Sequence, residues 1–361
     1  MNILHIISNL EIGGAQKLIA DLLPELNQEK DCEVCLVVFK TCGSDLEFKL
    51  KEKGIKVISL NCEIKSPKIF FKLIPYFKWA DIVHVHLFPT NYIVALVNTF
   101  FNKPLIFTEH STHNRRRDHK ILRPIEKYIY SRYKNLICIS PATKDKLHKW
   151  IGEKIADNRT KIIENGINFS NFDNINPKDS KTLFGRNGIP VLMISRFTNS
   201  KDHITLIRAI ALIENPEVFL VLVGDGERRK EYEAEIKKLK IENKVILLGN
   251  RNDIPDIIKA SFIGVQSSNW EGFGLTAIEM MAGGLPVIAS DVDGLRQVVE
   301  GAGIIFKKGS ERDLADKIKR LIDDNDLYYE TIRKCKKRKD SFSISKTANC
   351  YIDLYRKILE T

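Results

Sequence analysis

Apolar residues occur in short, nearly continuous runs along the first half of the chain, and these runs are rich in β-branched side chains. They are separated by turns and by segments in which apolar residues recur at helical spacing, as in residues 15–26 after the glycines 13 and 14. This alternation is typical of a parallel sheet with helices on both faces. The runs lie at residues 3–8, 33–39, 56–60, 82–87, 105–108 and 136–140.

The same pattern returns in the second half, at residues 191–195, 218–224, 245–249, 262–266 and 286–289. A polar stretch at 168–188 separates the halves, and a chain of 361 residues exceeds the usual size of one core. We therefore predict two doubly wound α/β domains, residues 1–170 and 189–343, joined by a linker at 171–188. Residues 344–361 are predicted to form an amphipathic helix that packs back toward the first domain. Ligands of such sheets bind outside the carboxyl ends of the strands.

The composition is that of an ordinary globular protein, with 43% hydrophobic and 29% charged residues. The sequence has no apolar run of membrane-spanning length and no leader pattern at its start, so we expect a cytoplasmic location. Its seven cysteines are scattered and mostly lie in apolar surroundings, which predicts reduced packing residues. Cys32 and Cys35 form a C-x-x-C at the start of a strand, where a redox role is not expected.

Positive charge is concentrated in one part of the first domain. The formal net charge is +11, and residues 63–132 contain twelve Lys and Arg against five Asp and Glu. In the segment 65–79 the cations alternate with aromatic residues, which is typical of a helix at a membrane interface, with Pro75 expected to interrupt it. We expect this basic face to bind an anionic membrane or an anionic acceptor. Its residues are Lys68, Lys72, Arg115, Arg116 and Arg117.

Two other interpretations of these cations stay open: a helix packed on the sheet with a solvated basic face, or a site for a soluble anionic acceptor such as a sugar phosphate. No nucleic-acid partner is expected, because no motif that reads RNA or DNA accompanies the charge.

The most informative segment, SNWEGFGLTAIE at 268–279, follows a predicted strand and opens a helix. A Gly-x-Gly turn at a helix N-terminus presents free backbone N–H groups to an anion, which suits a diphosphate. Glu271 and Glu279 flank this turn, and carboxylates there can accept hydrogen bonds from sugar or ribose hydroxyls. The segment therefore predicts a phosphorylated, polyhydroxyl ligand. Its predicted binding residues are Gly272, Phe273, Gly274, Leu275, Thr276 and Glu279.

Glu271 and Glu279, with the PVIAS strand at 286–290, resemble the E-x7-E signature of the family-four retaining glycosyltransferases. The resemblance implies a GT-B fold and a nucleotide-sugar donor held by the second domain. It also implies four catalytic residues, which are His110, Arg196, Lys201 and Glu271. Arg196 and Lys201 match the residues that grip the donor diphosphate, and their charges suit a departing nucleoside diphosphate. Gly224 matches a turn near the nucleotide. Asn250 and Arg251 match the loop that contacts the base.

In the first domain the resemblance implies that Gly14 lets the backbone approach the donor phosphates and that His110 lies near the donor sugar. It also implies that the leaving diphosphate helps to deprotonate the incoming hydroxyl, so that no cofactor and no metal are expected. Asp291 and Asp293 form a D-x-D, which we interpret as a loop and not as a metal site. One departure is Gln297, at a position where the family often has Glu.

We therefore predict a retaining hexosyl or N-acetylhexosaminyl transferase that uses a nucleotide sugar, with UDP favoured over GDP. The acceptor is expected to be a polyprenyl-linked glycan at the inner face of the cytoplasmic membrane, during assembly of a surface polysaccharide. The alternatives are a soluble acceptor, a GT-B sugar-nucleotide epimerase, and a non-catalytic subunit. The E-x7-E context disfavours the epimerase, and intact Arg196 and Lys201 disfavour the non-catalytic subunit.

Overall fold

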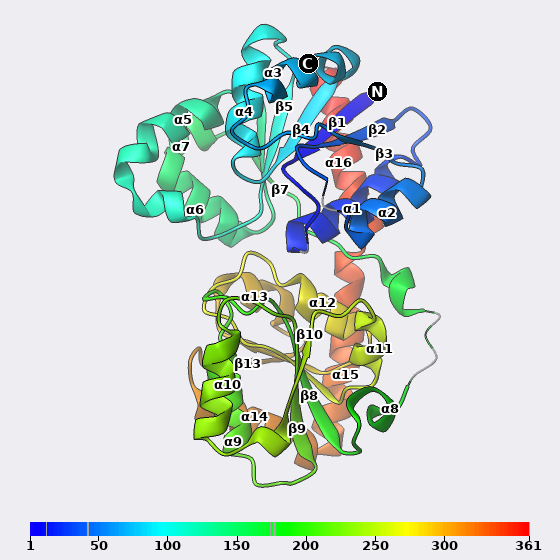
Figure 1. Cartoon of the computed structure of the whole chain (residues 1–361), viewed down its shortest axis with the longest axis vertical. Coiled ribbons are helices and arrows are strands. Elements are labelled where there is room, and N and C mark those ends of the chain that lie inside the picture. Colours follow the sequence, from blue (N-terminus) through cyan, green and yellow to red (C-terminus); the bar gives the residue numbers. More distant parts are fainter. Residues whose placement is uncertain (12, 42, 174, 176–177, 361) are drawn as a thin grey trace. The chain divides into compact units, whose positions relative to one another are not determined.

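A computed structural model describes residues 1–11, 13–41, 43–173, 175 and 178–360, with the side chain of Arg115 left out. The chain divides into two compact units, Met1–Asn168 with Ile344–Thr361, and Phe169–Ser343. In each unit, helices cover both faces of one parallel sheet, as Figure 1 shows. The segment predicted as a linker, 171–188, belongs to the second unit and contains helix α8 (Ser180–Phe184). Asn174, Asn176 and Pro177 in this segment lie outside the described residues.

The first unit is built on a seven-stranded sheet with the order β3-β2-β1-β4-β5-β6-β7. All its strand pairs are parallel. The direction of winding reverses between β1 and β4, so the switch point lies at these two strands. The strands are β1 (Asn2–Ile7), β2 (Glu33–Val38), β3 (Lys56–Ser59), β4 (Ile82–His86), β5 (Leu105–Glu109), β6 (Asn135–Cys138) and β7 (Thr160–Ile162).

Two layers of helices enclose this sheet. On one face, buried strand residues such as Leu4, Val83 and Phe107 form a continuous apolar core with the helices that follow β3, β4 and β5. On the other face, α16 (Ile344–Leu359) packs against α1 (Gly14–Leu26), which joins the end of the chain to its beginning (Figure 1). The remaining helices are α2 (Asp45–Glu52), α3 (Lys68–Trp79), α4 (Thr90–Val97), α5 (Arg123–Ser131), α6 (Pro141–Ile151) and α7 (Glu153–Ala156).

The second unit has a six-stranded parallel sheet of order β10-β9-β8-β11-β12-β13, with the switch point between β8 and β11. Its strands are β8 (Ile189–Ile194), β9 (Val218–Val223), β10 (Val245–Gly249), β11 (Ile263–Gln266), β12 (Val287–Ser290) and β13 (Ile304–Phe306). Its helices are α9 (His203–Ala211), α10 (Arg229–Lys238), α11 (Ile254–Lys259), α12 (Leu275–Ala282), α13 (Asp293–Val299), α14 (Glu311–Asp323) and α15 (Asn325–Lys339). Apolar residues of α9, α10 and α14 complete the core on one face.

The predicted doubly wound α/β architecture is confirmed, and the eleven strands predicted from the apolar runs all form, with ends shifted by no more than a few residues. Strands β7 and β13 were missed because each has only three residues and contributes no run of its own. The predicted interruption at Pro75 is wrong, since α3 continues through it to Trp79. Of the cysteines within the described residues, all are free and only Cys350 is exposed, while Cys42 lies outside them.

Candidate functional site

The loops that follow β8 and β11 lie side by side at the carboxyl edge of the second sheet. Lys201 forms a β-bridge with Ser268, and Asn269 donates a backbone hydrogen bond to the Ser200 carbonyl at 2.8 Å. Because β8 and β11 are the two strands at the switch point, their loops border the place where open α/β sheets bind ligands. The predicted Arg196–Lys201 segment and the predicted donor motif are thus brought together by the fold.

Lys201 and Glu271, which are 70 residues apart in sequence, form an ion pair at this edge. Their side chains are 17% and 19% exposed, so the pair is largely screened from water but open to a ligand. The other carboxylate oxygen of Glu271 accepts a hydrogen bond from the backbone N–H of Gly272 at 3.2 Å. A cation placed by a carboxylate in a partly dry site can stabilise negative charge on an incoming group.

Helix α12 begins directly after these residues with an N-terminus that no described side chain caps. Gly274 is its N-cap residue and has φ of +99°, a conformation that glycine adopts without strain. The backbone N–H groups at the very start of the helix and the helix dipole together favour an anion here. Glu279 lies one turn further along the helix and is buried.

Close backbone packing explains two of the glycines around the site. Gly224 follows β9 with φ of +127°, and a Cβ atom there would lie 2.1 Å from the Ser195 carbonyl oxygen. In the same way, a Cβ on Gly294 of α13 would lie 2.3 Å from the Glu271 carbonyl oxygen. Gly224 therefore allows the loop after β9 to reach the loop after β8, and Gly294 allows α13 to support the turn that carries Glu271.

The remaining predicted donor residues differ in how far they are free to bind. Arg196 is exposed and forms no ion pair within the described part of the chain. Asn250 is also exposed. The guanidinium of Arg251 is instead held by Asp253 through two hydrogen bonds of 2.8 and 2.6 Å. Arg196 is thus available to an anionic ligand, while the charge of Arg251 is already neutralised.

The D-x-D at 291–293 is divided between two structural roles. Asp291 forms an ion pair with Arg296, and Asp293 is the first residue of α13.

Three residues that hold the loops of this site in place were not predicted from the sequence. Ser290, at the end of β12, receives a hydrogen bond from the Ser268 backbone N–H at 2.9 Å and donates one to its carbonyl at 3.0 Å. His203 lies 2.9 Å from the Ser195 hydroxyl, and burial lowers the pKa of His203 to about 3. Gly294 is the third. The available signal was the position of Ser290 at the end of a predicted strand and of Gly294 shortly after it. Nothing in the sequence pairs His203 with Ser195.

Gly14 and His110 lie at the carboxyl edge of the first sheet. Gly14 is the first residue of α1 and follows the loop after β1. His110 directly follows β5, and its Nε2 lies 3.2 Å from Nδ1 of His86 at the end of β4. The other ring nitrogen of His110, Nδ1, is buried and has no hydrogen-bond partner among the described residues. Such an orphaned polar atom costs free energy unless a ligand pairs with it.

Two residues of the predicted basic face lie on α3. Lys68 and Lys72 are exposed on this helix, while Ile69, Leu73 and Phe77 are buried against the sheet. Lys72 also donates a hydrogen bond to the Leu60 carbonyl at 2.6 Å. The structure therefore agrees with the interpretation of this segment as a helix that packs on the sheet and exposes its basic residues.

The assignment of Arg116 and Arg117 to the basic face is wrong. Arg116 forms an ion pair of 2.9 Å with the buried Glu126 and lies over the Phe88 ring, and Arg117 forms one of 2.7 Å with the buried Glu109. A buried carboxylate needs such a partner, so these two charges serve the interior of the domain. The side chain of Arg115 lies outside the described residues.

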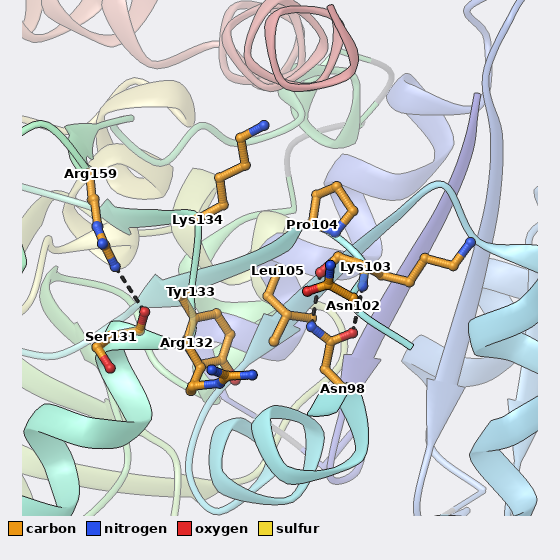
Figure 2. Close-up of a pocket in the computed structure, with 10 residues that line it drawn as sticks. All are labelled: Asn98, Asn102, Lys103, Pro104, Leu105, Ser131, Arg132, Tyr133, Lys134 and Arg159. Carbon is orange, nitrogen blue, oxygen red and sulfur yellow. Dashed lines mark hydrogen bonds between the residues drawn. The ribbon is translucent and has the colours of Figure 1, made fainter. Parts of the chain in front are cut away.

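A pocket of about 440 Å³ lies at the opposite edge of the first sheet (Figure 2). Its lining residues precede or begin β5, β6 and β7, so it is formed at the amino ends of these strands. Arg159 donates to the Ser131 carbonyl at 2.8 Å, and Asn98 is bonded to the backbone of Lys103. The pocket contains none of the predicted site residues, because those lie at carboxyl ends.

Comparisons with known proteins agree with this geometry. Residues 12–171 match the family model described as Glycosyltransferase Family 4, and residues 175–339 match the model described as Glycosyl transferases group 1. The structure of HepE from Anabaena in complex with UDP and glucose superposes with a TM-score of 0.87 at 22% identity, covering 98% of this chain and 99% of that one.

Curated relatives have similar lengths. A UDP-Gal:alpha-D-GlcNAc-diphosphoundecaprenol alpha-1,3-galactosyltransferase of Escherichia coli is 28% identical, covering 82% of this chain and 80% of the relative. A 4-alpha-N-acetylgalactosaminyltransferase of Campylobacter jejuni, named for an N-acetylgalactosamine-N,N'-diacetylbacillosaminyl-diphospho-undecaprenol substrate, is 26% identical over 95% of this chain and 96% of its own. An uncharacterised glycosyltransferase of Methanocaldococcus jannaschii is 30% identical over 68% of this chain and 67% of its own. Together with the two parallel-sheet units and the motif at their strand ends, these matches show that the chain belongs to the family-four glycosyltransferases of the GT-B fold.

Proposed function

We propose that the protein is a retaining, metal-independent glycosyltransferase that moves a hexosyl or N-acetylhexosaminyl group from a UDP-sugar to a sugar hydroxyl of a lipid-linked glycan. The observation that carries the donor part is the convergence of Lys201, Glu271 and the uncapped start of α12 at the switch point of the second sheet. The choice of UDP is supported by the UDP complexes of HepE and by the UDP-Gal in the name of the Escherichia coli relative.

In this proposal the second unit binds the donor and stabilises its leaving group. The diphosphate lies at the N-terminus of α12, and Lys201 and Arg196 neutralise the charge that develops on it. Glu271 holds the Lys201 ammonium in place, and Glu279 accepts hydrogen bonds from donor hydroxyls. No side-chain nucleophile is required, because the leaving phosphate itself takes the proton of the incoming hydroxyl.

The donor is identified by a thermal-shift and hydrolysis screen of UDP-glucose, UDP-galactose, their N-acetylhexosamine counterparts and GDP-mannose. We expect one UDP-sugar to stabilise the protein, and NMR of the transferred sugar to show the anomeric configuration of the donor. A product of inverted configuration would refute retention. Release of a free C2-epimerised sugar without any acceptor would support the epimerase instead.

The donor site is tested by Lys201→Ala and Glu279→Ala. Each variant should stay folded and lose roughly two to three powers of ten in turnover, as for loss of a charged transition-state contact. Lys237→Ala is the matched control, because Lys237 is exposed on α10 and forms no ion pair with a described residue. Near-normal turnover in either site variant would overturn the assignment.

The lipid-linked acceptor is proposed from the names of two relatives and from the surface of α3. The centroid of the Phe70 ring lies 5.4 Å from that of Phe71 and 5.2 Å from that of Phe100, and both of these neighbours are exposed. Along α3, Lys68 and Lys72 flank Phe70 and Phe71. Exposed aromatic rings beside cations suit the interface of an anionic membrane, where each cation contributes on the order of 1 kcal/mol. No helix within the described residues is both long and apolar enough to cross a membrane.

Liposome co-sedimentation tests the membrane part. We expect binding to vesicles rich in anionic lipid, weakened by salt, by Lys68→Glu with Lys72→Glu, and by Phe71→Ser. The control pair, Lys230→Glu with Lys237→Glu, changes the net charge equally but lies on α10 of the second unit. Protein that stays in the supernatant even at low salt would exclude membrane binding and favour a soluble acceptor.

A further inference from the structure

A chain of buried polar side chains runs through the first unit, between the sheet and α16. We call its members, His110, His86, His5, Tyr355, His84, Thr108 and Tyr351, the histidine chain. They come from β1, β4, β5 and α16 and from the residue that follows β5. His5 and His84 are register partners on neighbouring strands, and so are His86 and Thr108, which places all four on the face that α16 covers.

Each link of the chain is within hydrogen-bond distance. His110 Nε2 lies 3.2 Å from His86 Nδ1, and His86 Nε2 lies 3.0 Å from His5 Nδ1. His5 Nε2 lies 3.4 Å from the Tyr355 hydroxyl, which is 2.6 Å from His84 Nδ1. His84 Nε2 then lies 2.7 Å from the Thr108 hydroxyl, which is 3.3 Å from that of Tyr351.

These contacts disfavour a metal site at His5, His84 and His86, although their ring nitrogens approach within 4.8 Å of one another. Every ring nitrogen of the three residues already has a hydrogen-bond partner, so a metal ion would have to break part of the chain. Burial keeps the rings neutral, because it lowers the pKa of His5 to about 3 and that of His110 to about 4. The pKa values of His84 and His86 are also well below their ordinary range, through burial and the neighbouring histidines.

The three directly linked imidazoles, those of His110, His86 and His5, have only two consistent proton arrangements while all three rings are neutral. Each neutral ring has one N–H donor and one acceptor nitrogen, so the direction of one hydrogen bond sets the direction of the next. In one direction His110 donates from Nε2 to His86 and keeps a lone pair on Nδ1. In the other it accepts at Nε2 and leaves a buried, unpartnered N–H at Nδ1. The first direction leaves the surplus donor on the hydroxyl of Thr108 or Tyr351, where the hydrogen can rotate, whereas the second leaves it on a fixed N–H of His110. Because buried N–H groups without a partner are rare, the first arrangement is favoured.

We propose that His86, His5 and Tyr355 are positioning residues that fix His110 with an unprotonated Nδ1 facing the bound sugar, where it accepts a hydrogen bond from a sugar hydroxyl. The buried Nδ1 without a partner is the atom that such a hydroxyl would satisfy. Helix α16 comes from the C-terminal segment of the chain, which folds with the first unit. It thereby contributes to the proposed site through the Tyr355 hydroxyl. This inference rests on the proposed glycosyltransferase function and on the position near the donor sugar that the family resemblance implies for His110.

Tyr355→Phe and Tyr351→Phe form a matched pair of variants. Both remove one hydroxyl from a fully buried tyrosine of α16. Tyr355→Phe should cost more stability, because the Tyr355 hydroxyl has two hydrogen-bond partners and that of Tyr351 has one. Only the Tyr355 hydroxyl lies between His5 and His84, whereas Tyr351 ends the chain beyond Thr108. We expect Tyr355→Phe to lower kcat/KM by roughly tenfold, the usual size of a lost supporting contact, and Tyr351→Phe to change it less than twofold.

The ¹⁵N NMR shifts of the His110 ring report its tautomer directly and would not respond to a general loss of stability. We expect an unprotonated Nδ1 in the wild-type protein and in Tyr351→Phe, and a mixture of tautomers in Tyr355→Phe. A protonated Nδ1 in the wild type, or identical His110 spectra in both variants, would overturn the inference.

His110→Asn separates this outcome from failure of the proposed function. Full activity of that variant would remove His110 from the donor site. If His110→Asn loses activity while Tyr355→Phe and Tyr351→Phe behave alike, His110 stays in the site and only the role of the chain is refuted.

Discussion

Acid should destabilise the first unit at a pH well above that at which most carboxylates are protonated, because four histidines are kept neutral inside it. The folded-state pKa values of His5 and His110 are about 3 and 4, and those of His84 and His86 are well below 6.5. The unfolded chain therefore binds more protons than the folded one as the pH falls below about 6.5, and the free energy of unfolding decreases with it. Their stabilising contribution is complete above this pH.

The size of the effect follows from linkage. Between pH 7.5 and 5.0, a histidine with an unfolded pKa of about 6.5 and a folded pKa of 4 or less removes about 2 kcal/mol from the free energy of unfolding. His5 and His110 together remove about 4 kcal/mol, and His84 and His86 act in the same direction. Since domains are typically stable by about 5–15 kcal/mol, this loss is a large fraction of the stability of the first unit.

Tryptophan fluorescence can follow this unit alone. The chain has three tryptophans, Trp79 and Trp150 in the first unit and Trp270 in the second, so Trp270→Phe leaves reporters only in the first. Urea titrations of this protein at pH 7.5 and 5.0 give the two free energies of unfolding. A difference below about 1 kcal/mol would refute the buried-neutral assignment of the histidines.

A matched pair of variants isolates one histidine in the same background. His110→Asn should reduce the difference between the two pH values by about 2 kcal/mol, because it removes one group that must stay neutral in the fold. His119→Asn changes an exposed histidine of the same unit and should leave the difference as it was. Equal effects of the two substitutions would show that the acid sensitivity has another origin.

Three further outcomes are expected. Gly224→Ala should destabilise the second unit by about 3 kcal/mol in thermal or urea unfolding, because its Cβ would meet the Ser195 carbonyl in a backbone conformation that favours glycine. Gly294→Ala should instead displace the turn of Glu271 and lower turnover by roughly two powers of ten, and normal kinetics in this variant would show that the turn tolerates displacement. Transferase activity should survive excess EDTA, and a strict requirement for Mg²⁺ or Mn²⁺ that added metal restores would contradict the proposed chemistry.

The sequence by itself determined the architecture and the local geometry of the proposed donor motif. Parallel strands covered on both faces must be apolar almost throughout, so their runs can be recognised without any knowledge of the fold. Among the described strands only β7 and β13, with three residues each, were too short to be recognised. The proposed donor motif could also be recognised in the sequence, because its chemistry is local. A Gly-x-Gly turn, the helix it opens and the carboxylates at 271 and 279 lie within one short segment.

Tertiary structure decided which charges are available. Arg116 and Arg117 look identical to surface cations in the sequence, yet each pairs with a buried carboxylate from another element, Glu126 or Glu109. Lys72 and Phe71 on α3 remain exposed because the apolar stripe of that helix faces the sheet. Burial depends on which elements become neighbours, and charge patterns along the chain do not contain that information.

The histidine chain shows the same division most clearly. His84 and His86 alternate on a predicted strand, so the sequence indicates that they share one face. It does not indicate that His5 lies beside them. Nor does it indicate that the hydroxyl of Tyr355, 350 residues after His5, lies within hydrogen-bond distance of both His5 and His84. Hydrogen bonds need distances near 3 Å, and such distances between distant segments are set only when the strands pair and α16 packs on their buried face.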